Sequence, residues 1–290
     1  MTVLVFLDPA YANGRVVDAS KPALLATDQG VTRGDGIFES MLAVDGTPRK
    51  LTAHLDRLAV SAEMMDLAIP PAPVWERAIA TAIAEHPPAG ELVVKLLATR
   101  GVEGSGSPTA WVQASLPGPV GREQRESGID VLLLDRGYDS SVAERAPWLL
   151  LGAKTLSYAV NMAALRYARK HGADDVIFTS SNGRVLEGPT STVLIATVRD
   201  GVRTLTTPLL ESGILPGTSQ GALFKTAAEA GWQLGYGPLV PQDLFEADAV
   251  WLVSSIRLMA PVRSIDGRQI PVSHELTEEL TALLVKGSRE

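Results

Sequence analysis

The sequence contains no cysteine, which excludes disulfide bonds, thiolate metal sites and a cysteine nucleophile. Its four histidines, at 54, 86, 171 and 274, include no two at metal-ligand spacing, so no metal is expected. No basic cluster is present and the net charge is −7, which argues against a nucleic-acid partner. No hydrophobic run is long enough to cross a membrane, and the start lacks the basic region of a signal peptide. We therefore expect a soluble, cytoplasmic protein without a membrane partner.

Strand-like and helix-like patterns are mixed along the 290 residues, of which 46% are hydrophobic and 20% charged. That composition is typical of a well-packed globular protein with one large or two ordinary domains. Because strands and helices do not alternate strictly, the pattern indicates an α+β fold. The run Pro117-Gly118-Pro119, followed by charged residues, predicts a linker over 117–127. We expect one domain over 1–116 and a larger one over 128–290.

Hydrophobic periodicity predicts the individual elements. Strands are expected at 3–7, 15–17, 37–44, 92–99, 110–116, 129–134, 175–179, 185–187, 192–197 and 249–254. Helices are expected at 51–67, 74–85 and 155–170, with two more that start near 218 and 273. No internal repeat or low-complexity tract is present.

Lys154 has a distinctive setting among the seven lysines. It follows the apolar run 148–153 and directly precedes the helix expected over 155–170. A lysine held in apolar surroundings has a lowered pKa and can form a Schiff base with an aldehyde. The alternative is a surface lysine whose stem covers apolar neighbours while its ammonium group reaches water. Lys50, by contrast, stands in a helical setting that favours solvent.

The run 213–219 enters a helix and has the composition of an anion site. Gly217 permits close backbone approach, and Thr218 and Ser219 add hydroxyl groups to the free N–H groups of a helix start. An ordinary helix cap fits the same pattern. Ser255, at the end of the strand 249–254, offers a further hydroxyl. Glu187 ends the expected strand 185–187, where a carboxylate needs a partner if it is buried and is otherwise an exposed glutamate.

Six motifs occur in one order along nearly the whole chain. They are Arg33-Gly34-Asp35-Gly36-Ile37-Phe38-Glu39, His54-Leu55-Asp56-Arg57-Leu58, Lys154-Thr155-Leu156-Ser157, Leu186-Glu187-Gly188, 213–219, and Ser254-Ser255 ahead of Pro261-Val262. This order resembles the class IV, or fold-type IV, pyridoxal-phosphate enzymes: branched-chain aminotransferases, D-amino acid transaminases and aminodeoxychorismate lyases. The resemblance implies a D-amino acid aminotransferase-like fold of two domains, the smaller N-terminal one α/β and the larger with pseudo-barrel character. It also implies a homodimer whose active site lies between the domains and near the partner subunit.

The resemblance further implies the cofactor, pyridoxal 5'-phosphate, and a role for each matched residue. Lys154 resembles the Schiff-base lysine that also carries a proton during catalysis. Glu187 resembles the carboxylate that keeps the pyridine nitrogen protonated, so that the ring accepts charge from the substrate. Leu215 matches the residue that packs on one face of the ring. The groups implied to bind the phosphate are Arg57, the backbone N–H groups of Thr218 and Ser219, and the hydroxyls of Ser219 and Ser255.

Five positions bear on the small-molecule amine substrate. D-amino acid transaminases that resemble this chain place tyrosine at the position of Phe38, and carry an Arg-x-His pair where this chain has Ser105 and Ser107. Lyases of the family often carry threonine where Ser40 supplies a hydroxyl. Arg257 is a candidate for gripping the substrate carboxylate, with a surface ion pair as its alternative.

These comparisons predict an aminodeoxychorismate lyase that forms 4-aminobenzoate and pyruvate in folate biosynthesis. A D-amino acid or branched-chain amino acid transaminase is the alternative within the family. From a different class, a non-catalytic protein that binds a phosphorylated metabolite would need neither Lys154 nor Glu187.

Overall fold

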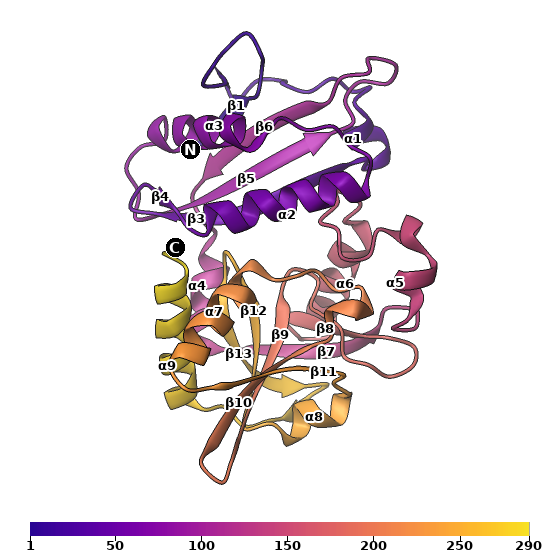
Figure 1. Ribbon diagram of the computed structural model, residues 1–290, viewed down its shortest axis with the longest axis vertical. Coiled ribbons are helices and arrows are strands. Elements are labelled where there is room, and N and C mark those ends of the chain that lie inside the picture. The colour runs from indigo at the N-terminus through magenta and orange to yellow at the C-terminus, as the bar shows by residue number, and fades with distance from the viewer. Residues whose placement is uncertain (290) are drawn as a thin grey trace. The chain divides into compact units, whose positions relative to one another are not determined.

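The computed structural model describes residues 1–289 and divides into two compact units (Figure 1). The first unit comprises Met1–Gly118 and Ala153–Tyr158, and the second comprises Pro119–Gly152 and the residues from Ala159 onward. The segment expected as a linker, 117–127, contains helix α4 (Pro119–Ser127), which belongs to the second unit. Proline is favourable at the first position of a helix, because the N–H group missing there has no partner within the helix.

An antiparallel sheet of six strands forms the centre of the first unit, in the order β2-β1-β6-β5-β3-β4. Its strands are β1 (Thr2–Phe6), β2 (Arg15–Val17), β3 (Gly36–Val44), β4 (Thr47–Pro48), β5 (Glu91–Thr99) and β6 (Thr109–Ser115). The helices of the unit are α1 (Gln29–Arg33), α2 (Leu51–Met64) and α3 (Ala72–Ala84).

Helices α2 and α3 cover the same face of this sheet. Leu58 of α2 and Trp75 of α3 join one hydrophobic cluster with Met41 of β3 and alternate residues of β5 and β6. Because side chains alternate along a strand, Phe38 and Ser40 of β3 belong to the opposite face. The sheet therefore separates a packed core from a face on which polar groups are found.

A mixed sheet of eight strands forms the second unit. The path runs β11-β10-β9-β12-β13-β7-β8, with β14 paired to β13; the pairs β10–β11, β13–β7 and β7–β8 are parallel. Its strands are β7 (Ile129–Asp135), β8 (Asp175–Thr179), β9 (Thr192–Arg199), β10 (Val202–Pro208), β11 (Gln233–Gly237), β12 (Ala249–Ser254), β13 (Leu258–Ile265) and β14 (Arg268–Gln269). Its helices are α4, α5 (Val142–Arg145), α6 (Ala159–Lys170), α7 (Thr218–Glu229), α8 (Pro241–Glu246) and α9 (His274–Gly287), with 3-10 turns η1 (Pro147–Leu149) and η2 (Leu210–Ser212).

Strand β12 is buried on both faces, which explains its unbroken hydrophobic sequence. Val250 and Leu252 join a cluster with residues of β7, β9 and β13, whereas Trp251 and Val253 join a second cluster with α7 and α9. This central strand ends at Ser254, so the residue that follows it, Ser255, is carried on a well-supported part of the sheet.

Among the differences between the structure and the expected elements, three lie near Lys154 or Glu187 in the sequence. The helix expected from 155 begins at Ala159, because 153–158 is bonded to β3 of the first unit instead. The strand expected over 185–187 is reduced to a single bridge at Val185. Trp148 stands in the 3-10 turn η1 and is 74% exposed, so the apolar run before Lys154 is not a buried strand.

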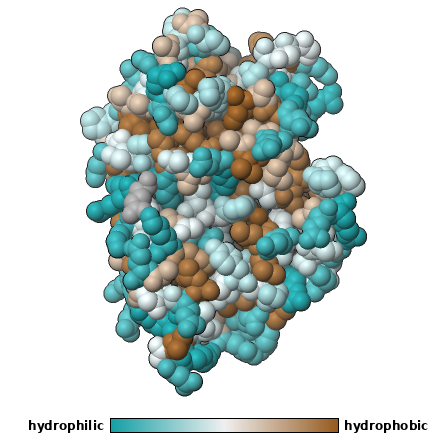
Figure 2. All heavy atoms as spheres, viewed as in Figure 1, coloured by the Kyte–Doolittle hydropathy of each residue, from teal (hydrophilic) through white to brown (hydrophobic). Residues whose placement is uncertain are grey.

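The surface carries both hydrophobic and hydrophilic side chains. On the face that Figure 2 shows, brown hydrophobic spheres lie among teal hydrophilic ones. Such single exposed hydrophobic side chains are normal for a folded protein. Within residues 1–289, no helix combines the length and hydrophobicity needed to cross a bilayer.

Candidate functional site

The backbone around Lys154 runs alongside the first residues of strand β3 and is hydrogen-bonded to them. The Phe38 N–H donates to the Lys154 carbonyl at 3.0 Å, and the Leu156 N–H donates to the Gly36 carbonyl at 2.7 Å. On its other side, the Lys154 N–H donates to the Ser61 hydroxyl of α2 at 3.1 Å. A Cβ atom on Gly36 would lie 2.5 Å from the carbonyl oxygen of Ala98 on the neighbouring strand β5, so only glycine fits at this position of β3.

The Lys154 side chain extends over two aromatic rings. Its Nζ lies 4.6 Å from the Phe38 ring centroid and 6.0 Å from that of Tyr158. The two rings pack edge to face with centroids 5.3 Å apart. Aromatic faces attract an ammonium group and also exclude water from one side of it. The amine is therefore half-buried and held in one direction, as a Schiff-base lysine requires.

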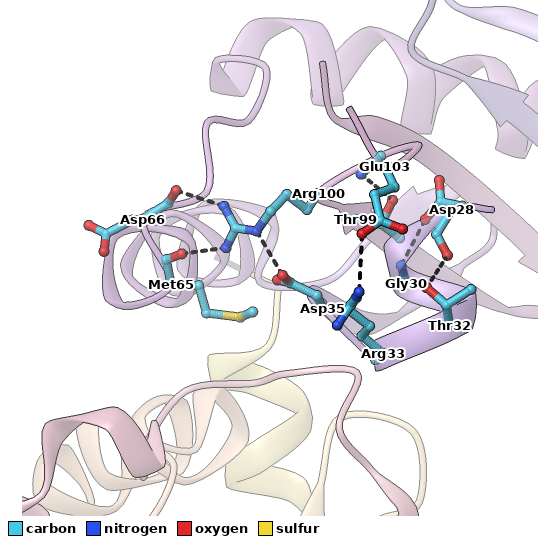
Figure 3. A network of polar contacts seen from close by, with 12 residues as sticks. Asp28, Gly30, Thr32, Arg33, Asp35, Met65, Asp66, Thr99, Arg100 and Glu103 are labelled. Carbon is cyan, nitrogen blue, oxygen red and sulfur yellow. Dashed lines mark hydrogen bonds and ion pairs between the residues drawn. The ribbon is translucent and has the colours of Figure 1, made fainter. Parts of the chain in front are cut away.

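A second network fixes the turn that leads into β3, and Figure 3 shows it at close range. Arg100 Nε donates to Asp35 Oδ2 at 2.7 Å, while its other nitrogens donate to the Met65 and Asp66 carbonyls at the end of α2. This arginine thereby ties the end of β5 to the start of β3 and to α2. Ser105 and Ser107 lie beyond it in an exposed loop and bond to each other.

Arg57 is anchored in the core of the first unit by a buried carboxylate. Its Nε and Nη2 donate to Oε1 and Oε2 of Glu39 at 2.7 and 2.9 Å, and His54 Nδ1 lies 2.7 Å from Oε2. Burial opposes ionisation of Glu39, but the charge of Arg57 and hydrogen bonds from both partners outweigh it and lower the pKa to about 2. Burial also lowers the pKa of His54, against the hydrogen bond and the charge of Glu39, which raise it.

Lys50 lies beside this cluster and is buried, contrary to the solvent-facing setting expected from the sequence. Only 6% of it is exposed, and its backbone is in the left-handed region at φ 55°. Burial, and then the nearby charge of Arg57, lower its pKa to about 8. Lys50 directly precedes α2, the helix that carries His54 and Arg57.

Glu187 lies beside strand β8 in the second unit. Its carbonyl accepts from the Phe178 N–H at 2.9 Å, and its Oε2 accepts from the Leu215 N–H at 3.1 Å. Sequence reasoning missed Tyr138: burial raises the pKa of its phenol, and the Glu187 carboxylate is close enough to raise it further, against the opposing charge of Arg136. Two residues singled out separately in the sequence, Glu187 and Leu215, are thus joined by a hydrogen bond.

A group of hydroxyls meets at the start of α7, which we name the hydroxyl cup: Thr218, Ser219 and Ser255. Ser255 Oγ lies 3.0 Å from Thr218 Oγ1 and 3.3 Å from Ser219 Oγ. Gly217 precedes the helix without a side-chain cap, and a Cβ there would lie 2.4 Å from Thr192 Oγ1. N–H groups at a helix start and clustered hydroxyls suit an anion with several acceptor oxygens.

Arg257 is enclosed rather than open to a substrate. Its Nη1 donates to Asp175 Oδ2 at 2.7 Å and to Gln124 Oε1 at 3.2 Å, and the paired side chains are 11% and 2% exposed. Its Nε and Nη2 are buried and have no hydrogen-bond partner among residues 1–289. This setting of Arg257 differs from both expectations, a guanidinium that binds the carboxylate of a substrate and an ion pair on the surface. Among residues 1–289, no cluster of metal-ligating side chains is found.

Comparison with known proteins identifies the family. A family model described as amino-transferase class IV matches residues 36–265. The chain belongs to the class IV aminotransferases. The bifunctional aminodeoxychorismate lyase / D-amino acid transaminase of Mycobacterium tuberculosis is 44% identical over 265 residues, 89% of this chain and 91% of that protein. Among solved structures, a fold IV transaminase from Curtobacterium pusillum has a TM-score of 0.91 and 44% identity, covering 98% of this chain and 99% of that one.

A further structure, the pyridoxal-phosphate-bound form of a hypothetical aminotransferase from M. tuberculosis, has a TM-score of 0.92 and 41% identity, covering 99% of this chain and 98% of that one. The chain of this class IV aminotransferase therefore has the type IV fold, and it is a pyridoxal-phosphate-dependent enzyme, either an aminotransferase or an aminodeoxychorismate lyase. The non-catalytic alternative is set aside. The residues fit the cofactor: a primary amine suits its aldehyde, a carboxylate its pyridine nitrogen, and a helix start with hydroxyls its phosphate.

Proposed function

We propose that this enzyme is an aminodeoxychorismate lyase that forms 4-aminobenzoate and pyruvate. The observation that carries the proposal is a combination of two features. Lys154 is directed over the Phe38 ring. The exposed loop has Ser105 and Ser107 where D-amino acid transaminases have a basic pair. A substrate with two carboxylates and a leaving group does not need the grip that a small D-amino acid requires. The similarity to a bifunctional relative supports the same choice.

We assign each matched residue a role in holding the cofactor. Lys154 binds the aldehyde carbon, Glu187 keeps a proton on the pyridine nitrogen, and Leu215 covers one face of the ring. The phosphate is assigned to Arg57 and to the hydroxyl cup, with the N–H groups of Thr218 and Ser219. Glu39 orients Arg57 for that purpose through its two hydrogen bonds.

Bound pyridoxal phosphate supplies an electron-accepting ring that takes up charge from the substrate carbon. Lys154 Nζ would hold the aldehyde carbon of the cofactor and, as a free amine, would accept the proton from the amine-bearing carbon of the substrate. The Phe38 and Tyr158 rings limit the directions from which water reaches that nitrogen. In the lyase reaction the enolpyruvyl oxygen leaves, and the gain of aromaticity favours the step. In transamination, Lys154 returns the proton to a different carbon.

Phe38 and Ser40 are assigned to the substrate, since they share the sheet face that lies opposite the core. Arg257 is assigned to the framework rather than to the substrate, because its side chain is 11% exposed and its Nη1 is paired with Asp175. D-Amino acid transamination is the second activity we assign to the same site, favoured by the bifunctional relative. A homodimer stays a prediction, which sedimentation velocity tests.

The deciding measurement is a comparison of kcat/KM on purified enzyme. Aminodeoxychorismate is assayed by the release of 4-aminobenzoate, beside D-alanine and branched-chain amino acids with 2-oxoglutarate. We expect the lyase reaction to have the largest kcat/KM and D-alanine a smaller but measurable one. Efficient turnover of D-alanine without any 4-aminobenzoate would show that the lyase assignment is wrong.

A further inference from the structure

The loop between β12 and β13 carries Ser255 and is followed directly by a residue with a strained backbone. Ser254 pairs with Leu258, so the loop consists of Ser255, Ile256 and Arg257. Leu258, the first residue of β13, has φ 62°, in the left-handed region that a leucine rarely adopts. A backbone of this kind persists only where its surroundings hold it.

Arg125, on helix α4, supplies one of the contacts that hold this loop. Its Nε donates to the Arg257 carbonyl at 2.8 Å and its Nη2 donates to the Ile256 carbonyl at 2.7 Å. A guanidinium is planar and rigid, so two bonds from one group fix both the position and the tilt of two successive peptide groups. The residue lies 131 positions from Ile256 in the sequence, so packing alone brings the two together.

Gln124, the residue before Arg125 on α4, makes a second contact with the loop. Gln124 accepts a hydrogen bond from the Arg257 side chain at 3.2 Å, and the buried Asp175 accepts another at 2.7 Å. Inside the loop, the Arg257 N–H donates to the Ser254 hydroxyl at 3.2 Å. The loop backbone is thus bonded from α4, and its one long side chain is bonded to α4 and to the start of β8.

We propose that Arg125 is a positioning residue for the hydroxyl cup. It bonds two carbonyls of the loop, and through them it sets Ser255 Oγ at 3.0 Å from Thr218 Oγ1 and 3.3 Å from Ser219 Oγ. This inference rests on the proposed function of the cup as the phosphate site. Without Arg125, the loop loses these two hydrogen bonds, and the Ser255 hydroxyl moves away from the start of α7.

The test compares two ligands that differ only in the phosphate. Apo-protein is titrated with pyridoxal phosphate and with pyridoxal, and binding is followed by the visible band that borohydride abolishes. For Arg125→Gln we expect the affinity for pyridoxal phosphate to fall about tenfold, the loss typical of one charge-assisted hydrogen bond, and that for pyridoxal to stay within about twofold. Arg169→Gln, an exposed arginine on α6, is the control and should match the wild type for both ligands.

Arg125→Lys provides a second variant that is more certain to fold. One ammonium group bonds one carbonyl but cannot fix two peptide planes, so we expect a smaller loss for pyridoxal phosphate and a shifted phosphorus resonance of the bound cofactor. Equal losses for both ligands would show a general structural effect and overturn the inference. Unchanged affinity for pyridoxal phosphate in both variants would overturn it too. A wild-type protein that forms no visible band with either ligand would instead refute the proposed function itself.

Discussion

Both oxygens of the Glu39 carboxylate are bonded to Arg57, at 2.7 and 2.9 Å, in the core of the first unit. Glu39 is fully buried and the Arg57 side chain is 12% exposed. A pair of this kind costs desolvation to form, so it is weak evidence of net stabilisation, but removing one partner leaves a buried charge without its counterion. The pair therefore locks the orientation of Arg57 more than it strengthens the fold.

We predict that Glu39→Gln lowers the free energy of unfolding by about 3 kcal/mol at pH 7. The depressed pKa, about 2 against an ordinary 4.5, means that the carboxylate contributes stability above pH 4.5 and loses it as the pH falls towards 2. The difference between wild type and variant in urea unfolding should shrink over that interval. Glu63→Gln, a change at an exposed position of α2, is the control. A gap independent of pH would contradict the assignment.

Lys50 gives a slope of the same sign at alkaline pH. Its pKa is about 8 in the folded chain against an ordinary 10.5, so the unfolded chain holds the proton more tightly between these values. We predict that the wild type gains stability relative to Lys50→Met as the pH rises from 8 to 10.5. Unfolding in urea across this range measures the gain, with Lys170→Met, at an exposed position, as the control. Parallel curves for wild type and Lys50→Met would show that the lysine is not buried.

Lys154→Ala should abolish turnover and the visible band of the lysine-bound cofactor, because no other amine is held in that position. The melting temperature should remain near that of the wild type, since the backbone bonds of the segment do not involve the side chain. Lys95→Ala, on an exposed site of β5, should behave as the wild type. Full activity of Lys154→Ala would remove the basis of the functional assignment.

Glu187→Gln should keep bound cofactor but lose one to two decades of kcat. A neutral amide still accepts the Leu215 N–H but does not hold a proton on the pyridine nitrogen by charge. The loss corresponds to roughly 1.5–3 kcal/mol, the worth of a hydrogen bond to a charged group. Single-turnover kinetics with the cofactor-loaded variant measure it, beside Glu211→Gln as an exposed control. An unchanged kcat would show that Glu187 has another role.

Much of the fold follows from local sequence patterns. Strand β12 is predicted because its sequence is an unbroken hydrophobic run, and in the structure its alternate residues face two hydrophobic clusters. Helix α9 is predicted because Ser273 caps a helix with one apolar face. Strand β10 was missed, since its threonines give no clear alternation. Helix α6 was placed four residues too early, because nothing local shows that 155–158 bonds to β3 instead.

The sequence by itself determined which chemical groups the enzyme owns and in what order: a lysine, a glutamate and a run of hydroxyls at a helix start. Only the tertiary structure decided their surroundings. It buried Lys50, joined Glu39 to Arg57, enclosed Arg257 and brought Arg125 to a loop 131 residues away. The physical reason is range. Periodicity and capping depend on neighbours within about four residues, whereas burial, and the pKa values and partners that follow from it, depend on segments that meet only when the chain packs.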